Sequence, residues 1–447
     1  MVAFNFLGCD RDQELLLPPS LREWLPEDHL AWFVVDVVAS MDLSGVYASY
    51  REDGWGRAAF DPQMMVALLV YAYAIGERSS RKIERRCRED VAFRVVTANR
   101  VPDHATIARF RARHERAVAD LFTQVLGVCA RAGLVSVGVV AVDGSLIAGD
   151  ASPRATRSYA SIRREVDEML AEAARVDARE DAEFGDRRGD ELPAELADPR
   201  GRRERLRQAL EDLEREQAAE QASCQAQLDR REAWEADHGR KLAGRRPSPP
   251  APDALEKRRA NTTDPDTRLM KRSGGRAVQG YNAQAVATPG QIILAARVTQ
   301  AHNDTDQLAP MVTEAGLAAR QAGVEEPIET ALADGGYWNP DHITHIQDEG
   351  IDVLIPPPRR RRAGSGQLEP VHGDHAQRMT TRLRTAEATA LYQRRQQLIE
   401  PVFAHTKYLR RCDRFMRRGL VACQAEWHLI AATHNLLKLW RASPQPA

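Results

Sequence analysis

The sequence lacks the long apolar run that a membrane-spanning protein needs. Although 43% of its 447 residues are hydrophobic, no stretch of about 18 uninterrupted apolar residues occurs. The first residues also lack a basic stretch leading into an apolar run, which is the pattern of a secretory signal. We therefore expect a protein with a cytoplasmic location and no membrane partner.

Cysteine is scarce and scattered. The six cysteines form no C-x-x-C pair and no Cys/His cluster with the spacing of a zinc site. Their positions are Cys9, Cys87, Cys129, Cys224, Cys412 and Cys423. This pattern predicts reduced structural thiols rather than a zinc centre.

An excess of one charge sign is also missing, since the formal net charge is -1. The total hides an uneven distribution. Acidic residues concentrate at about 161–237, whereas arginine is frequent at 78–116, 357–362 and 382–418. Because binding to DNA phosphate requires a local excess of Lys and Arg, separate parts of the chain are expected to have different partners.

Helical periodicity follows Pro62. Apolar side chains recur at i, i+3, i+4 spacing from Met64 to Ile75, after a capping Asp61. Two further short helices are predicted to expose basic side chains, namely Arg81, Lys82, Arg109 and Arg113. Such helices fit a helix-turn-helix-like DNA-binding module. An ordinary helical domain with a solvated basic face is the alternative.

Two hydrophobic strands each lead into an aspartate that is followed by glycine. The strand at 135–142 runs into Asp143-Gly144, and the strand at 328–333 runs into Asp334-Gly335. We expect each aspartate at the end of its strand. The glycines would let a nucleic-acid backbone approach closely.

The remaining pattern predicts a mixed α/β layer with a central sheet covered by helices. A β-hairpin is expected over 281–298, and another short strand over 351–355. Helices are expected over 305–322, 385–408 and 424–440. The predicted fold class is therefore α+β and multidomain, with an all-helical N-terminal domain over 1–132.

An acidic segment interrupts the sheet-forming part. Residues 162–237 show heptad-like apolar spacing in two stretches, and a proline-rich linker follows at 247–252. We predict an antiparallel helical hairpin. Its apolar positions either pack the two arms together or pair with a second copy of the chain.

Three acids suggest metal-dependent chemistry. Two divalent ions about 3.5–4 Å apart stabilise both ends of an in-line displacement at phosphorus, and Mg2+ prefers oxygen ligands. Asp143 and Asp334 are the best-placed ligands because each follows a strand. Glu400, on the predicted helix at 385–408, is by itself better explained as an ion-pair partner of nearby arginines.

A second polar cluster contains His302, Asp304 and Asp306. Asp304 precedes an apolar run that begins at Leu308, so helix capping explains the cluster better than a metal site does.

Three motifs recur in order along the chain: Val142-Asp143-Gly144-Ser145, Ala333-Asp334-Gly335-Gly336-Tyr337 and Tyr392-x2-Arg395-x4-Glu400-x6-Lys407. Together they resemble the three acidic motifs of the DDE transposases of bacterial insertion sequences. The stretches at 60–62, 102–110, 264–270 and 280–284 resemble the group that includes insertion sequence family 1182. The similar stretches span nearly the whole chain apart from about 155–257 and the short ends.

The resemblance implies an RNase H-like α/β catalytic domain over 133–155 and 258–441, interrupted by the helical hairpin and linker at 156–257. It implies that Asp143, Asp334 and Glu400 are catalytic and hold two Mg2+ or Mn2+ ions.

Neighbouring residues are then expected to contact DNA. Tyr392, Arg395 and Lys407 would hold phosphates near the cut. The superfamily signature leaves three residues between the arginine and the glutamate, whereas four separate Arg395 from Glu400. Trp338 either stacks on an unpaired base or is buried in the core.

The implied activity is cleavage at the inverted-repeat ends of the element and strand transfer into target DNA, with a homodimer as the active form. Two alternatives stay open. One is a catalytically decayed transposase that acts as a sequence-specific DNA-binding regulator, and the other is a metal-dependent nuclease without strand transfer.

Overall fold

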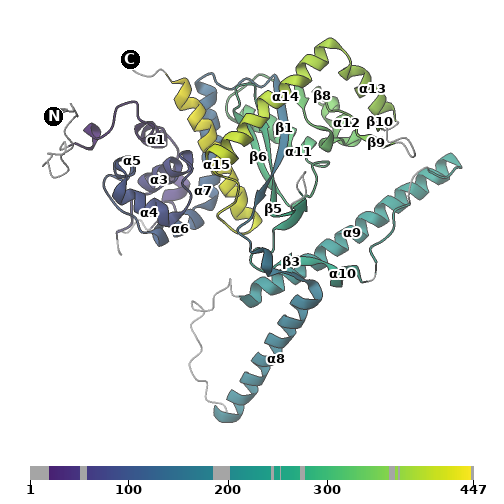
Figure 1. The fold of residues 1–447 in the computed structure, drawn as a ribbon, viewed down its shortest axis with the longest axis horizontal. Coiled ribbons are helices and arrows are strands. Elements are labelled where there is room, and N and C mark those ends of the chain that lie inside the picture. The colour runs from purple at the N-terminus through teal and green to yellow at the C-terminus, as the bar shows by residue number, and fades with distance from the viewer. Residues whose placement is uncertain are drawn as a thin grey trace, which may run out of the picture.

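A computed structural model gives the fold as a central mixed sheet surrounded by helices (Figure 1). It describes residues 20–50, 58–184, 202–242, 246–251, 253–271, 277–361, 368–370 and 373–443. The mixture of helices and sheet agrees with the predicted α+β class. Within these residues, no helix combines the length and hydrophobicity needed to cross a bilayer.

The N-terminal part is helical. Its elements are η1 (Leu21–Glu23), α1 (Leu30–Ala39), α2 (Ser44–Tyr47), α3 (Pro62–Ala74), α4 (Ser80–Glu89), α5 (Val91–Val96), α6 (His104–Arg113) and α7 (Glu115–Arg131). As predicted, Asp61 caps α3 by accepting hydrogen bonds from the backbone N–H groups of Gln63 and Met64. Every residue of α3 from Met65 to Ala74 is buried, so this helix forms the centre of the N-terminal part.

The central sheet has six strands. They are β1 (Val139–Ala148), β4 (Arg268–Lys271), β5 (Ala277–Ala287), β6 (Ile293–Thr299), β7 (Thr330–Leu332) and β8 (Asp352–Leu354). Their order is β4-β5-β1-β7-β8, with β6 also paired to β5. The pairs that involve β5 are antiparallel, whereas β1, β7 and β8 run parallel. The predicted hairpin at 281–298 is confirmed as β5 and β6.

β1 continues past the point where the sequence predicted its end. Its antiparallel partner β5 stays in register from the pair Ala141 and Ala287 to the pair Ala148 and Gly280. The parallel pairing with β7 ends at Ala141. Asp143 therefore lies within a strand and just beyond the parallel pairing, so the prediction that it ends a strand was wrong.

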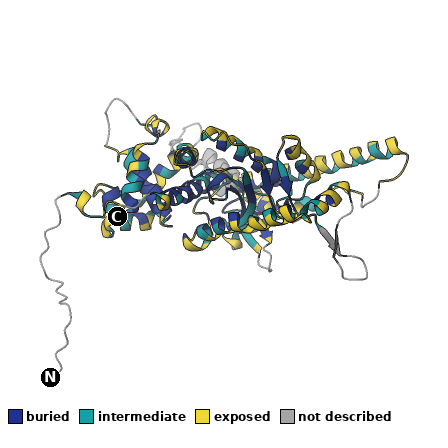
Figure 2. Ribbon diagram, turned by 90° about the horizontal axis from the view of Figure 1, so that it is seen from above, coloured by how far each residue is buried: buried dark blue, intermediate teal, exposed yellow. Residues whose placement is uncertain are grey.

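Helices and short strands complete the C-terminal part. They are α11 (Leu308–Gln321), η3 (Gly335–Tyr337), α12 (Pro340–Asp348), β9 (Arg359–Arg361), β10 (Leu368–Pro370), α13 (Asp374–Leu383), α14 (Ala386–Ala404), the π-helical turn η4 (His405–Leu409) and α15 (Leu420–Ala442). α14 packs on β1 and β5, and α15 packs on β6 and on the N-terminal helices α3 and α7. The sheet and the N-terminal helices therefore share one core, which Figure 2 shows as a continuous buried centre.

A buried ion pair joins the N-terminal helices to α15. Arg78 Nη1 lies 3.2 Å from Glu426 Oε1, and the two side chains are only 7% and 0% exposed. Arg78 also donates to the backbone carbonyl of Arg411 at 2.7 Å. Glu426 accepts hydrogen bonds from the backbone N–H groups of Met416 and Arg417. Interior contacts, and not a surface linker alone, thus hold the N-terminal helices against the sheet.

The chain between β1 and β4 forms η2 (Pro153–Ala155), β2 (Thr156–Ser158), α8 (Tyr159–Phe184), α9 (Arg202–His238), α10 (Ala254–Lys257) and β3 (Arg259–Asn261). Tyr159 and Ile162 of α8 pack with Leu206 and Leu213 of α9. Figure 1 shows the two helices crossing there and then diverging. This differs from the predicted antiparallel hairpin, in which the end of α8 would meet the start of α9.

The composition of α9 explains the difference. Beyond Leu213, its described side chains are half-buried or exposed and mostly polar, and a helix that is polar all round has no stripe along which a partner helix packs. The side chains of Ala173 and Val176, two of the predicted heptad positions, lie outside the described ones. The domain boundaries stay predictions.

Candidate active site

The strand register places Asp143 and Asp334 side by side. Ala141 of β1 stands opposite Leu332 of the parallel strand β7, and each aspartate follows two residues later. Adjacent strands lie about 4.8 Å apart, so the two carboxylates are neighbours. The Asp334 charge accordingly helps to raise the pKa of Asp143.

Asp143 is a largely buried carboxylate that pairs with Arg395. Its Oδ1 accepts a hydrogen bond from the Gly144 N–H at 2.8 Å, and its Oδ2 lies 3.4 Å from Arg395 Nη1. Burial raises its pKa from 3.8 to about 6, and the charges of Asp334 and Asp304 act in the same direction. The Gly144 hydrogen bond and Arg395 lower the pKa but do not offset burial.

This raised pKa predicts a pH-dependent gain in stability for Asp143→Asn. Because the folded pKa of about 6 exceeds 3.8, ionisation of Asp143 favours unfolding, and stability falls as pH rises between these values. At about 1.4 kcal/mol per pKa unit, the metal-free variant is expected to be up to about 3 kcal/mol more stable than wild type at pH 8. Thermal melts of both proteins in chelator at pH 8 and pH 5 measure this gain in stability. Equal gains at both pH values would contradict its attribution to the raised pKa of Asp143.

Asp334 is held at the start of a short helical turn. Its side chain accepts a hydrogen bond from the Gly336 N–H at 2.7 Å and so caps η3. Tyr337, in the same turn, is fully buried, and its hydroxyl donates to Gln284. The carboxylate of Asp334 is therefore fixed by its own backbone and by the packing of the residues after it.

Gly144, which follows Asp143, does not leave room for a nucleic-acid backbone. A Cβ atom on Gly144 would lie 2.3 Å from Gln284 Nε2 and 2.9 Å from both Asn282 Oδ1 and Asp304 Oδ1. Polar side chains already fill this space. The prediction that Gly144 admits a nucleic-acid backbone was therefore wrong, and packing is what requires the glycine.

Asp304, which the sequence pattern assigned to helix capping, belongs to this polar cluster. α11 begins at Leu308 without any side-chain cap, so the capping prediction was wrong. Asp304 Oδ1 instead accepts hydrogen bonds from Asn282 Nδ2 at 2.7 Å and from Gln284 Nε2 at 2.6 Å. The available signal was the pair of polar residues, Asn282 and Gln284, in the alanine-rich second half of β5.

Helix α14 directs Tyr392 and Arg395 toward the aspartates. Arg395 is only 12% exposed at its side chain and pairs with Asp143. Burial raises the pKa of Tyr392, and the charges of Asp334 and Asp143 also raise it, whereas Arg395 lowers it. The structure thus brings both residues, predicted as DNA contacts, to the carboxylates.

Lys407 reaches the same strand from the turn after α14. Its Nζ donates to Ser145 Oγ at 2.8 Å and to the Leu146 carbonyl at 3.2 Å. Since Ser145 is two residues beyond Asp143, this cation also lies beside the carboxylates.

Glu400 faces away from them. It is exposed, whereas Leu398 and Ile399 just before it are buried. At 100° per residue, Glu400 lies about 140° around the helix from Arg395, and among the described residues no hydrogen bond or ion pair involves it. A spacing with one residue fewer would place both side chains on one helix face, so the extra residue explains why they diverge.

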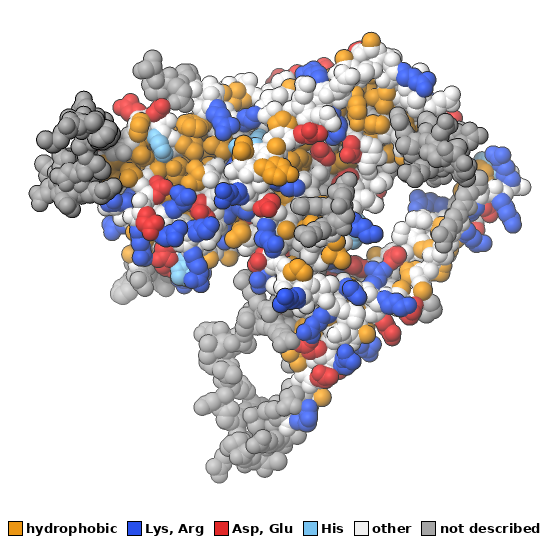
Figure 3. All heavy atoms as spheres, viewed as in Figure 1, with side chains coloured by type: hydrophobic (Ala, Val, Ile, Leu, Met, Phe, Trp, Pro, Cys, Tyr) orange, Lys and Arg blue, Asp and Glu red, His pale blue; other side chains and the backbone are white. Residues whose placement is uncertain are grey.

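All four predicted basic DNA contacts on the N-terminal helices are exposed. Arg81, Lys82 and Arg109 are exposed. Arg113 is also exposed but donates to the Ser49 carbonyl and lies over the ring of Tyr50, with 5.2 Å from its guanidinium carbon to the ring centroid. On the face drawn in Figure 3, basic side chains over these helices alternate with acidic ones.

Trp338 is half-buried and packs against the core. This position favours the core interpretation for the indole ring. Its stacking on a base stays a prediction.

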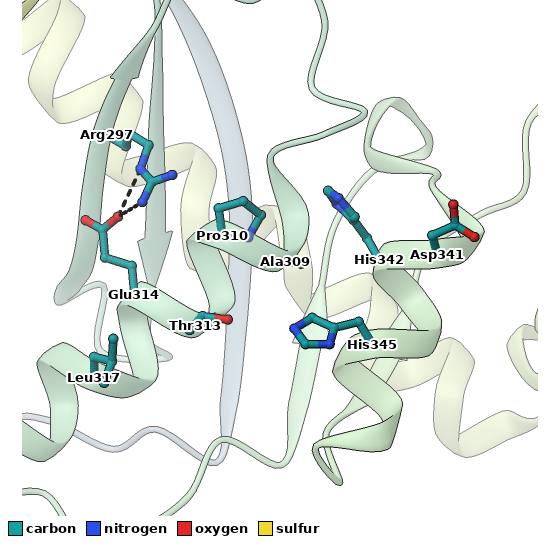
Figure 4. A pocket seen from close by; sticks show the side chains of 9 residues that line it. All are labelled: Arg297, Ala309, Pro310, Thr313, Glu314, Leu317, Asp341, His342 and His345. Atoms are coloured by element: carbon teal, nitrogen blue, oxygen red, sulfur yellow. Dashed lines mark hydrogen bonds and ion pairs between the residues drawn. The ribbon is translucent and has the colours of Figure 1, made fainter. Parts of the chain in front are cut away.

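A separate cavity of about 670 Å³ opens between α11 and α12. Figure 4 shows the ion pair of Arg297 and Glu314 on one side and the imidazoles of His342 and His345 on the other. Neither Asp143 nor Asp334 lines this cavity. It therefore does not belong to the carboxylate site.

The two adjacent aspartates suit a hard divalent cation. Mg2+ is commonly held by one or two carboxylates together with phosphate and water oxygens. Within the described ranges, no three His, Cys, Asp or Glu groups are arranged to hold a metal ion. Asp143 and Asp334 thus fit as a pair of ligands for Mg2+ or Mn2+, while the third ligand and the second ion stay predictions.

Two protein-family models match the chain. Residues 19–113 match one described as Transposase domain (DUF772), and residues 251–436 match one described as Transposase DDE domain. No curated protein and no solved structure matches. The second match contains Asp334 and all of α14, whereas Asp143 precedes it on β1.

Proposed function

We propose that this chain, whose two matched domains support a DDE transposase, cuts DNA at the ends of an insertion sequence and joins them to target DNA. The observation that carries the proposal is the adjacency of Asp143 and Asp334, set by the parallel register of β1 and β7. Membership of insertion sequence family 1182 stays a prediction.

The residues around the aspartates support the chemistry. Bound Mg2+ or Mn2+ would activate the attacking oxygen and stabilise the leaving one. Asp143 and Asp334 would hold the cation, and Arg395 would turn its planar guanidinium from Asp143 to a DNA phosphate. Lys407, fixed to Ser145, would place a point charge on a neighbouring phosphate.

The sheet supports an RNase H-like arrangement for the catalytic domain. Its strands β4, β5, β6 and β1 form antiparallel pairs, and β7 and β8 extend the sheet in parallel. We assign residues 133–155 and 258–441 to this domain and 156–257 to an insertion. The exposed Arg81, Lys82 and Arg109 of the N-terminal helices would then bind DNA phosphate, and a homodimer would hold both ends.

A cleavage assay tests the proposed function. Wild-type protein is incubated with Mg2+ and labelled duplex taken from the DNA that flanks the gene, with a chelator as control. The expected products are metal-dependent nicks and joined strands. Nicks without joined strands would favour the nuclease alternative, and specific binding without any cutting would favour the DNA-binding regulator.

Glu400 is the proposed third carboxylate on the strength of the motif that it shares with Tyr392, Arg395 and Lys407, although its side chain is exposed in the structure. Glu400→Gln is expected to reduce cutting by about 100-fold with little change in DNA binding. Glu387→Gln, at another exposed glutamate of α14, is the matched control. Equal activity of the two variants would remove Glu400 from the site.

A further inference from the structure

Two large apolar side chains stand in solvent on the turn that follows α14. Tyr408 is 78% exposed and Leu409 is 77% exposed, more than any other large hydrophobic side chain that the structure describes. Both belong to the π-helical turn η4. Such turns are rare and occur frequently at functional sites.

The turn is fixed from beneath. Arg410, the next residue, is 3% exposed and donates to the backbone carbonyls of Ile430 at 3.1 Å and Tyr73 at 2.8 Å. The Cys412 N–H donates to the carbonyl of the buried Thr406 at 2.9 Å. Tyr408 and Leu409 therefore lie on a turn that hydrogen bonds to the protein interior hold in place.

The same turn lies beside the carboxylates. Lys407, directly before Tyr408, donates to Ser145 two residues beyond Asp143. DNA held at Asp143 and Asp334 would therefore run close to the two apolar side chains.

The chain after the turn is basic. Arg411, Arg414 and Arg418 are exposed, and the Arg411 guanidinium makes no hydrogen bond or ion pair with any described residue. Cations around an apolar tip favour a polyanion such as the phosphate backbone of DNA.

We propose that Tyr408 and Leu409 form an apolar wedge that enters DNA at the cut and unstacks a base step. The proposal rests on the proposed function. Apolar side chains inserted between base steps unstack the duplex, and aromatic rings stack on bases of any sequence. Arg411 would hold the phosphate beside the opened step.

Fluorescence of 2-aminopurine, which rises when the base is unstacked, tests the wedge. The probe is duplex DNA flanking the gene, with 2-aminopurine at the base step that is cut. Wild type is expected to raise the fluorescence severalfold, and the double variant Tyr408→Ala, Leu409→Ala is expected to lose that rise. Leu269→Ala, at a 54% exposed leucine of β4, is the matched control and keeps it.

Cutting by the double variant gives an independent measure. On paired duplex its rate is expected to fall about 10- to 100-fold, and a duplex with mismatched bases at the cut is expected to restore it. Equal cutting of both duplexes, or a fluorescence rise equal to wild type, would overturn the wedge. A changed mass in solution with unchanged fluorescence would instead assign the turn to pairing between copies.

A different result would contradict the proposed function without contradicting the wedge. If wild-type protein binds the duplex but cuts neither form, the enzyme assignment falls, while the fluorescence comparison still decides whether the turn opens DNA.

Discussion

Replacing Asp334 with asparagine is expected to lower metal-dependent DNA cutting by about three orders of magnitude while DNA binding stays within about twofold. Asparagine retains an oxygen that accepts the Gly336 N–H, so the cap of η3 is kept. Only the negative charge beside Asp143 is lost. The rate of strand cutting and the affinity for the same labelled duplex, measured in parallel, separate the two effects.

Asp341→Asn provides the matched control. Asp341 is exposed in the first turn of α12, so the same chemical change outside the carboxylate site is expected to leave cutting within about twofold. Loss of cutting in both variants would point to a general effect of charge on this surface. A fully active Asp334→Asn protein would refute the assignment of Asp334 as a metal ligand.

Glu426→Ala is expected to destabilise the fold by about 3–5 kcal/mol, because it leaves the Arg78 guanidinium buried without its carboxylate. The change also removes the acceptor of two backbone N–H groups, those of Met416 and Arg417. Calorimetric melting of the full chain measures the loss.

Glu314→Ala tests whether burial is the cause. Glu314 pairs with Arg297 at 2.7 Å, but the side chains are 31% and 40% exposed. An exposed pair contributes about 0–1 kcal/mol, so this variant is expected to melt close to wild type. Similar losses in the two variants would contradict the role given to burial.

Sequence patterns predicted the helices and strands that neighbouring residues in the chain specify. The cap at Asp61 and the apolar face that follows it specify α3, and the alternation around Pro289-Gly290 specifies the β5 and β6 hairpin. The sequence also indicated that Asp143 and Asp334 follow hydrophobic stretches, but their adjacency comes from the parallel pairing of β1 with β7, which the local pattern does not specify.

Pairing between distant segments was not predictable in this way. β1 extends to Ala148 because β5 continues beside it. The sequence of β1 itself does not indicate that β5 pairs with it. Asp304 was assigned to helix capping because its true partners, Asn282 and Gln284, lie on a different strand. The ion pair of Arg78 and Glu426 joins residues 348 positions apart.

The position of Glu400 illustrates how a motif and its geometry can differ. The motif gives the order Tyr392, Arg395, Glu400 and Lys407, but a helix turns 100° at each residue. One additional residue between Arg395 and Glu400 rotates the glutamate toward solvent while Arg395 stays on Asp143. Motif order therefore does not determine which of these side chains lie on one face of α14.

The shared core of α3, α7 and α15 has a consequence for DNA length. Because buried side chains fix the N-terminal helices to the sheet, the distance between DNA bound by those helices, as proposed, and a phosphodiester at Asp143 would be constant. The chain would therefore cut at a fixed number of base pairs from the DNA that the N-terminal helices bind. Inserting about five base pairs, half a helical turn of DNA, between the two sites would turn the bond to be cut away from the aspartates.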